Sequence, residues 1–112
     1  MITLYIKIGK NKYGVKIANN FKSRLIGLMG KRNIDYAMLF PHCNSIHTFL
    51  MKENIDVVGL DLNNEVIYKY ENLRKNQVIK IKHPQNKTSI LELPNNASKK
   101  IKIGQILIFE ED

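Results

Sequence analysis

The sequence predicts a mainly β fold: a small closed or partly open antiparallel β-barrel or sandwich of about eight short strands, with one short α-helix at about 20–29. Apolar and polar residues alternate in short runs along most of the chain, which is the pattern of half-buried strands. Turn-forming Gly, Pro and Asn residues separate these runs at short intervals. The chain shows no strand–helix–strand repeat, and 112 residues are typical of a single domain, 1–112.

The first part of the chain is predicted to be a β-hairpin followed by the helix. Apolar residues alternate over 2–8 and again over 13–17, with a turn at 9–12 between them. From residue 20 the apolar spacing becomes helical, and Gly30 suits the left-handed residue that ends a helix. The apolar stripe of this helix consists of Phe21, Leu25, Leu28 and Met29.

The rest of the chain is predicted to consist of short strands separated by turns. Residues 55–61 are almost continuously apolar, which predicts a central strand that is covered on both faces. We expect a single helical turn within 95–100 and a frayed acidic tail at 110–112. The other strands are expected at 36–40, 46–51, 66–70, 78–81, 89–93 and 105–109.

Composition and charge exclude several classes of protein. The net charge is +8, but the chain holds 15 Lys and 3 Arg beside 16 Ile and 13 Asn, a bias that AT-rich codons alone produce. Nucleic-acid readers rely on Arg, and no nucleic-acid-binding motif is present, so we do not expect nucleic acid as a partner, and a non-specific nucleic-acid binder is a less favoured alternative. One cysteine excludes a disulfide framework. No membrane-length apolar run or secretory signal is visible, so we expect a cytoplasmic protein without membrane contact.

Several sequence blocks together resemble the domain of unknown function 192 family. The blocks are Arg-Leu-Ile-Gly-Leu-Met at 24–29, Met-Leu-Phe at 38–40, Cys-Asn-Ser-Ile-His-Thr-Phe-Leu-Met at 43–51, Ile-Asp-Val-Val-Gly-Leu-Asp at 55–61, and Leu-Glu-Leu at 91–93 followed by Gly104. Gly59 and Leu50 stand where aromatic residues are common in the family. The resemblance implies a compact, mostly β domain and implies no particular activity.

Cys43, His47 and Met51 are spaced four and four, so they share a face on either a strand or a helix. Thiolate, imidazole and thioether form a soft ligand set suited to copper, which makes these residues a candidate metal site. We expect no cofactor, and copper is the alternative. The same residues also fit ordinary roles, with Cys and Met as core fillers and His as a hydrogen-bonded structural residue. A cysteine–histidine enzyme is a further alternative, although no oxyanion-binding element is visible beside Cys43.

Three charged residues are the remaining candidates. Asp56 lies within an apolar strand, where an unpaired carboxylate is costly, and Arg24 lies on the predicted helix, so we expect the two to form a partly buried pair. Glu92 alternates with two leucines and is expected to face away from them, towards solvent or a cleft. If Glu92 joined His47 and Asp56, the three would mark a polar ligand site.

These residues predict a binding module rather than an enzyme. We expect it to bind a small polar ligand or a protein partner at the surface formed by Arg24 and the segment Cys43–Asp56, with Arg24, His47, Asp56 and Glu92 as candidate ligand-binding residues. Exposed sheet edges are compatible with either a monomer or a homodimer.

Overall fold

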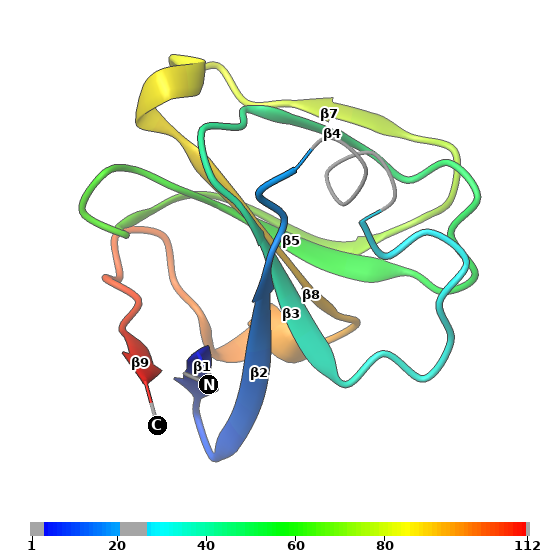
Figure 1. The fold of residues 1–112 in the computed structure, drawn as a ribbon, viewed down its shortest axis with the longest axis horizontal. Coiled ribbons are helices and arrows are strands. Elements are labelled where there is room, and N and C mark those ends of the chain that lie inside the picture. The colour runs from blue at the N-terminus through cyan, green and yellow to red at the C-terminus, as the bar shows by residue number, and fades with distance from the viewer. Residues whose placement is uncertain (1–3, 21–26, 112) are drawn as a thin grey trace.

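The computed structural model describes residues 4–20 and 27–111, and these form nine strands and two short 3-10 helices (Figure 1). The strands are β1 (Leu4–Ile8), β2 (Asn11–Ile17), β3 (Tyr36–Phe40), β4 (Ser45–His47), β5 (Ile55–Leu60), β6 (Val66–Leu73), β7 (Val78–Lys80), β8 (Ser89–Pro94) and β9 (Phe109–Glu111). The 3-10 helices are η1 (Gln85–Lys87) and η2 (Ala97–Lys100). The mainly β fold predicted from sequence is therefore confirmed.

Seven strands form one mixed sheet in the order β6-β5-β8-β3-β2-β1-β9, and β4 and β7 form a separate two-stranded sheet. Neighbours pair antiparallel except for β2 and β3, which run parallel. Figure 1 shows the β4–β7 pair at one end of the molecule and β1 and β9 at the other.

The large sheet does not close into a barrel through strand pairing, because β6 and β9 are its two edges. The segment 104–107 connects these edges instead. Its backbone makes hydrogen bonds with residues 64–66, including Leu107 N–H to Asn64 O at 2.9 Å, and a single bridge pairs Ile106 with Glu65. The fold is therefore the partly open form of the predicted alternatives.

Two apolar cores lie on the two faces of the sheet. One contains Val58, Leu60, Leu91 and Leu93 with residues of β1 and η2, and the other contains Ile55, Val57, Phe40 and Ile90 with residues of the β4–β7 sheet. All six residues of β5 are buried, which confirms the predicted central strand. Among the described residues, no helix is both long and apolar enough to cross a membrane.

Several local predictions differ from the structure. The strand expected at 46–51 is shorter, because β4 ends at His47 and residues 48–52 form a loop. The predicted helix falls mostly on 21–26, outside the described residues. Residues 27–30, which were expected to end this helix, form a non-helical turn instead. Gly27 has a φ of 51°, which is incompatible with a right-handed helix, whereas Gly30 has the expected left-handed φ of 72°.

The last strand begins later than predicted. The connecting segment 104–107 contains most of the predicted strand, and Phe109–Glu111 forms β9 against β1. Glu110 and Glu111 are therefore paired rather than frayed, and the Tyr5 hydroxyl donates to Glu110 Oε2 at 2.7 Å. The apolar run 106–109 extends across both segments, so it could not identify the residue at which pairing with β1 begins.

Candidate functional site

Asp56 connects three elements from a fully buried position in β5. Its Oδ1 accepts the backbone N–H of Asn72 at 2.9 Å, where the register between β5 and β6 shifts. Its Oδ2 accepts both the backbone N–H of Ser98 at 2.9 Å and the Ser98 hydroxyl at 2.6 Å. These bonds satisfy a buried carboxylate and hold β5, β6 and η2 together. The expected partner, Arg24, lies outside the described residues, so the Arg24–Asp56 pair stays a prediction.

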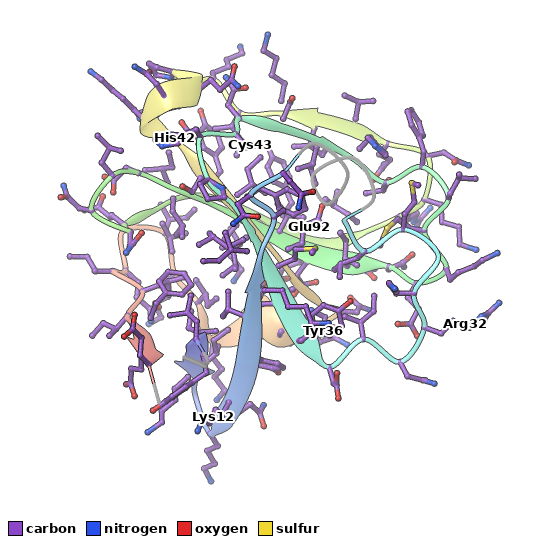
Figure 2. The ribbon with its side chains drawn as sticks, viewed as in Figure 1. Lys12, Arg32, Tyr36, His42, Cys43 and Glu92 are labelled. Atoms are coloured by element: carbon purple, nitrogen blue, oxygen red, sulfur yellow. The ribbon has the colours of Figure 1, made fainter. Side chains whose placement is uncertain are left out.

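Glu92 is buried, and the expectation that its carboxylate faces solvent or an open cleft is wrong. The side chain does face away from Leu91 and Leu93, as alternation requires, but the second apolar core and the turn at 27–30 cover this face. Only 4% of the residue is exposed. Figure 2 shows Glu92 in the interior, whereas Arg32 lies at the periphery.

The surroundings of Glu92 change its acid–base behaviour. Burial raises the pKa of this carboxyl to about 8, and a hydrogen bond from the backbone N–H of Leu28 opposes the increase. Its Oε1 has no hydrogen-bond partner among the described residues. The nearby Glu92 also contributes, after burial and Asp35, to a raised pKa of Tyr36.

Asp56 and Glu92 lie on opposite faces of the sheet. Glu92 is paired with Val57, and paired residues share a face, so the adjacent Asp56 points to the other side. The two carboxyl groups therefore cannot form one polar site together with His47.

Cys43, His47 and Met51 each make local contacts. The Cys43 thiol donates to Ser45 O at 3.1 Å, and His47 Nδ1 accepts the backbone N–H of Phe49 at 3.2 Å while its ring stacks on the Phe49 ring. Met51 is buried and borders a pocket. Within residues 4–20 and 27–111, no group of three or more His, Cys, Asp or Glu side chains is placed to hold a metal ion. The copper hypothesis, which includes Met51, stays a prediction.

Three connections form a pocket of about 510 Å³ beside the β4–β7 sheet. They are the turn 27–30, the loop 48–52 that follows β4, and the loop 74–77 between β6 and β7. The described lining residues combine apolar side chains with two lysines and no acidic residue. They are Met29, Gly30, Leu50, Met51, Lys52, Lys75 and Asn76, which we call the loop pocket.

Leu50 has an unusual conformation at this pocket. Its φ is 60°, a left-handed value that is rare for a bulky non-glycine residue, and 70% of the residue is exposed. Its carbonyl accepts the Gly30 N–H at 3.0 Å, which ties the loop 48–52 to the turn 27–30. Backbone strain of this kind concentrates at functional sites, because the surrounding structure must maintain it.

Thr48 fixes the third wall of the loop pocket. Its buried hydroxyl donates to Arg74 O at 2.6 Å and accepts the Gln77 N–H at 2.8 Å. Its backbone bonds to Gln77 O and accepts from the Asn76 N–H. These four bonds hold the loop 74–77, and with it Lys75, next to the loop that follows β4.

Thr48→Val is expected to lower the free energy of unfolding by about 2–3 kcal/mol, because it leaves the Gln77 N–H and the Arg74 carbonyl without their side-chain partner. Thr48→Ser retains the hydroxyl and loses only a methyl group, so its effect is expected to be about 1 kcal/mol. Urea unfolding measures both variants, and faster hydrogen exchange at the Gln77 amide locates the effect. Equal loss of stability in the two variants would contradict this role of the hydroxyl.

Of the candidates chosen from sequence that the structure describes, only Met51 lines the loop pocket. Leu50 and Lys52 lie within the predicted segment Cys43–Asp56 but were not named as site residues, and Lys75 and Asn76 lie outside the predicted surface. The apolar run Phe49-Leu50-Met51 directly before Lys52 was the available signal, but the segment fitted an extended strand equally well.

Comparison with known proteins identifies the family. The model of DUF192, described as "Uncharacterized ACR", matches residues 4–108. The chain belongs to the DUF192 family. The resemblance of the sequence blocks is thereby confirmed.

Curated relatives share part of the DUF192 chain. A UPF0127 protein of Thermococcus sibiricus is 44% identical over 59 residues, which are 47% of this chain and 38% of the relative. A UPF0127 protein of Thermococcus kodakarensis is 39% identical over 66 residues, which are 53% of this chain and 42% of the relative. The matched region thus spans about two fifths of the length of each relative.

Solved structures share the DUF192 fold. A protein of unknown function from Novosphingobium aromaticivorans superposes with a TM-score of 0.75 at 15% identity, covering 96% of this chain and 83% of that one. A Sinorhizobium meliloti protein described as "a putative transcription regulator" gives a TM-score of 0.77 at 17% identity, covering 99% and 94%. At these identities the likeness shows the fold alone.

Proposed function

We propose that this DUF192 chain is a binding module whose loop pocket takes a small amphipathic anion, a carboxylate or similar group that carries a short apolar chain. The observation that carries the proposal is the composition of the loop pocket. Met29, Leu50 and Met51 offer an apolar surface, and Lys52 and Lys75 supply positive charge without an acidic residue in the described lining. Its volume of about 510 Å³ lies within the range of small-molecule sites.

Charge and conformation add support. The lysines complement an anionic headgroup, and the net charge of +8 favours the approach of an anion. The exposed side chain of Leu50, held by a strained backbone, offers an apolar surface against which the apolar chain of a ligand would pack. This refines the polar ligand expected from sequence to a ligand with an apolar part, and it moves the site from His47, Asp56 and Glu92 to the loop pocket.

Octanoate is a suitable probe, and the methionine methyl groups report its position. The chain has four Met, of which Met29 and Met51 line the loop pocket and Met38 lies in the core. In a titration followed by methyl NMR, we expect saturable shifts of Met29 and Met51 and none of Met38. The expected dissociation constant is about 0.1–1 mM for a ligand of this size. Octylamine, with the opposite charge, is expected to bind about tenfold more weakly.

Charge variants test the role of the lysines. Lys52→Gln and Lys75→Gln are each expected to weaken octanoate binding about threefold, because each removes one exposed cation. Lys102→Gln, which removes an exposed lysine outside the loop pocket, serves as the matched control. The proposal is wrong if octanoate shifts neither Met29 nor Met51, or if octylamine binds equally well.

A further inference from the structure

One wall of the loop pocket rests on a buried acid. The turn 27–30 contributes Met29 and Gly30 to the pocket, and the preceding residue, Leu28, is buried against the sheet. The Leu28 backbone N–H donates a hydrogen bond to the carboxyl group of Glu92. The contact between this wall and the sheet therefore includes an ionisable group that is 4% exposed.

The turn 27–30 is held at a few defined points. The carboxyl group of Glu92 accepts the Leu28 N–H, and the Gly30 N–H donates to Leu50 O. Within the turn, the Lys31 N–H donates to Leu28 O at 3.2 Å. A Cβ at Gly27 would lie 3.3 Å from Glu92 Oε1 and 3.2 Å from the Phe40 ring, so the turn packs directly onto the acid. A change at Glu92 must therefore act first on the wall of the loop pocket.

Glu92 tolerates this position in one protonation state only. A neutral carboxyl can lie in an apolar core with a single N–H donor, whereas a carboxylate with one unpartnered oxygen there is costly. Within residues 4–20 and 27–111, the groups that face it offer no compensation. Met38 on β3 and Val57 on β5, which are paired with Glu92, are apolar, and the turn 27–30 has no titratable side chain. Tyr36 on β3 is the described titratable group whose pKa the charge of Glu92 affects. The raised pKa of Glu92, about 8, is consistent with this arrangement.

We propose that Glu92 is a proton-controlled anchor for the wall of the loop pocket. With its proton in place, the turn 27–30 lies seated on the sheet and the pocket is formed. When the proton is lost, the carboxylate needs more donors than the Leu28 N–H alone, so water enters under the turn to supply them and the pocket loosens. Ligand binding through Met29 and Gly30 favours the seated state, so binding and protonation support each other reciprocally. This inference rests on the proposed function, because it concerns regulation of the same pocket.

The test measures octanoate binding against pH in the wild type and in Glu92→Gln, which keeps the shape and cannot ionise. Octanoate is ionised throughout the range used. We expect its dissociation constant to rise about tenfold between about pH 6.5 and about pH 9.5 in the wild type and less than about twofold in Glu92→Gln. Any effect of pH on the lysines appears in both proteins and cancels in the comparison. Glu92→Met is a second neutral variant in case the glutamine amide is poorly accommodated.

A ligand-free measurement separates this inference from the proposed function. The Met29 methyl resonance is expected to shift with pH with a midpoint near 8 in the wild type and not in Glu92→Gln. A wild-type affinity that does not change with pH, or the same change in Glu92→Gln, overturns the anchor. If octanoate binds at no pH, the proposed function fails, and a Met29 resonance that does not titrate overturns the anchor as well.

Discussion

Asp56→Ala is expected to lower the free energy of unfolding by about 3–5 kcal/mol. The substitution removes the acceptor of three hydrogen bonds, which come from the Asn72 N–H, the Ser98 N–H and the Ser98 hydroxyl. Each buried donor that is left without an acceptor costs about 1–3 kcal/mol. Such a loss is a large part of the 5–15 kcal/mol, roughly, that stabilises a typical domain. The melting temperature and urea unfolding measure the effect directly.

Matched variants identify the cause of this loss. Asp56→Asn has nearly the same shape but points an NH₂ group at donors, so it is expected to be almost as destabilising. Ser98→Ala removes only the hydroxyl bond and is expected to cost about 1 kcal/mol. Lys7→Ala, at an exposed position of β1, should stay within about 0.5 kcal/mol of the wild type. An Asp56→Ala protein that melts like its parent would show that these bonds do not stabilise the fold.

The stability of the protein is expected to fall with rising pH because of Glu92. Its pKa is about 8 in the folded protein and near 4.5 in the unfolded chain, so the folded state holds a proton that the unfolded state releases. The contribution of Glu92 is therefore fully present below about pH 4.5 and is lost progressively as the pH rises to about 8. At about 1.4 kcal/mol per pH unit, the difference of about 3.5 pH units amounts to about 5 kcal/mol.

Glu92→Gln isolates this contribution because it removes the titration and keeps the side-chain length. The difference in free energy of unfolding between variant and wild type is expected to move in favour of the variant from about pH 5 to about pH 9, by up to the same amount. Urea unfolding at several pH values measures this difference, and other titrating groups cancel in it. A difference that is constant over this range would mean that Glu92 has the same pKa in the folded and unfolded states.

The strands were predictable because their signals are local. Tyr36–Phe40 is an apolar run stopped by Pro41, and both ends of β3 were predicted correctly from these residues alone. The position of β9 was not predictable, because the apolar run 106–109 spans the boundary at residue 109 and only pairing with β1 marks where the strand begins. The parallel pairing of β2 and β3 likewise depends on how the intervening segment crosses.

The candidate site was less predictable because it depends on the packing of distant loops. The loop pocket joins residues near 29, 51 and 75, and no spacing in the sequence indicates that these loops meet. For Glu92, alternation correctly predicted that the side chain points away from Leu91 and Leu93. It could not predict that the second apolar core and the turn 27–30 cover this face of the sheet. For Asp56, the cost of a buried carboxylate correctly indicated a need for partners, and the described partners are backbone groups and a serine rather than a cation.

The strand order has a consequence for synthesis of the protein on the ribosome. β8 lies between β3 and β5, so these two strands have no neighbour in common until residues 89–94 have emerged, and β1 lacks its outer neighbour until residues 109–111 have emerged. A partly translated chain therefore exposes unpaired strand edges and apolar strands for most of its synthesis. Such intermediates attract chaperones and aggregate readily, and folds with pairing between distant strands typically fold in about milliseconds to seconds.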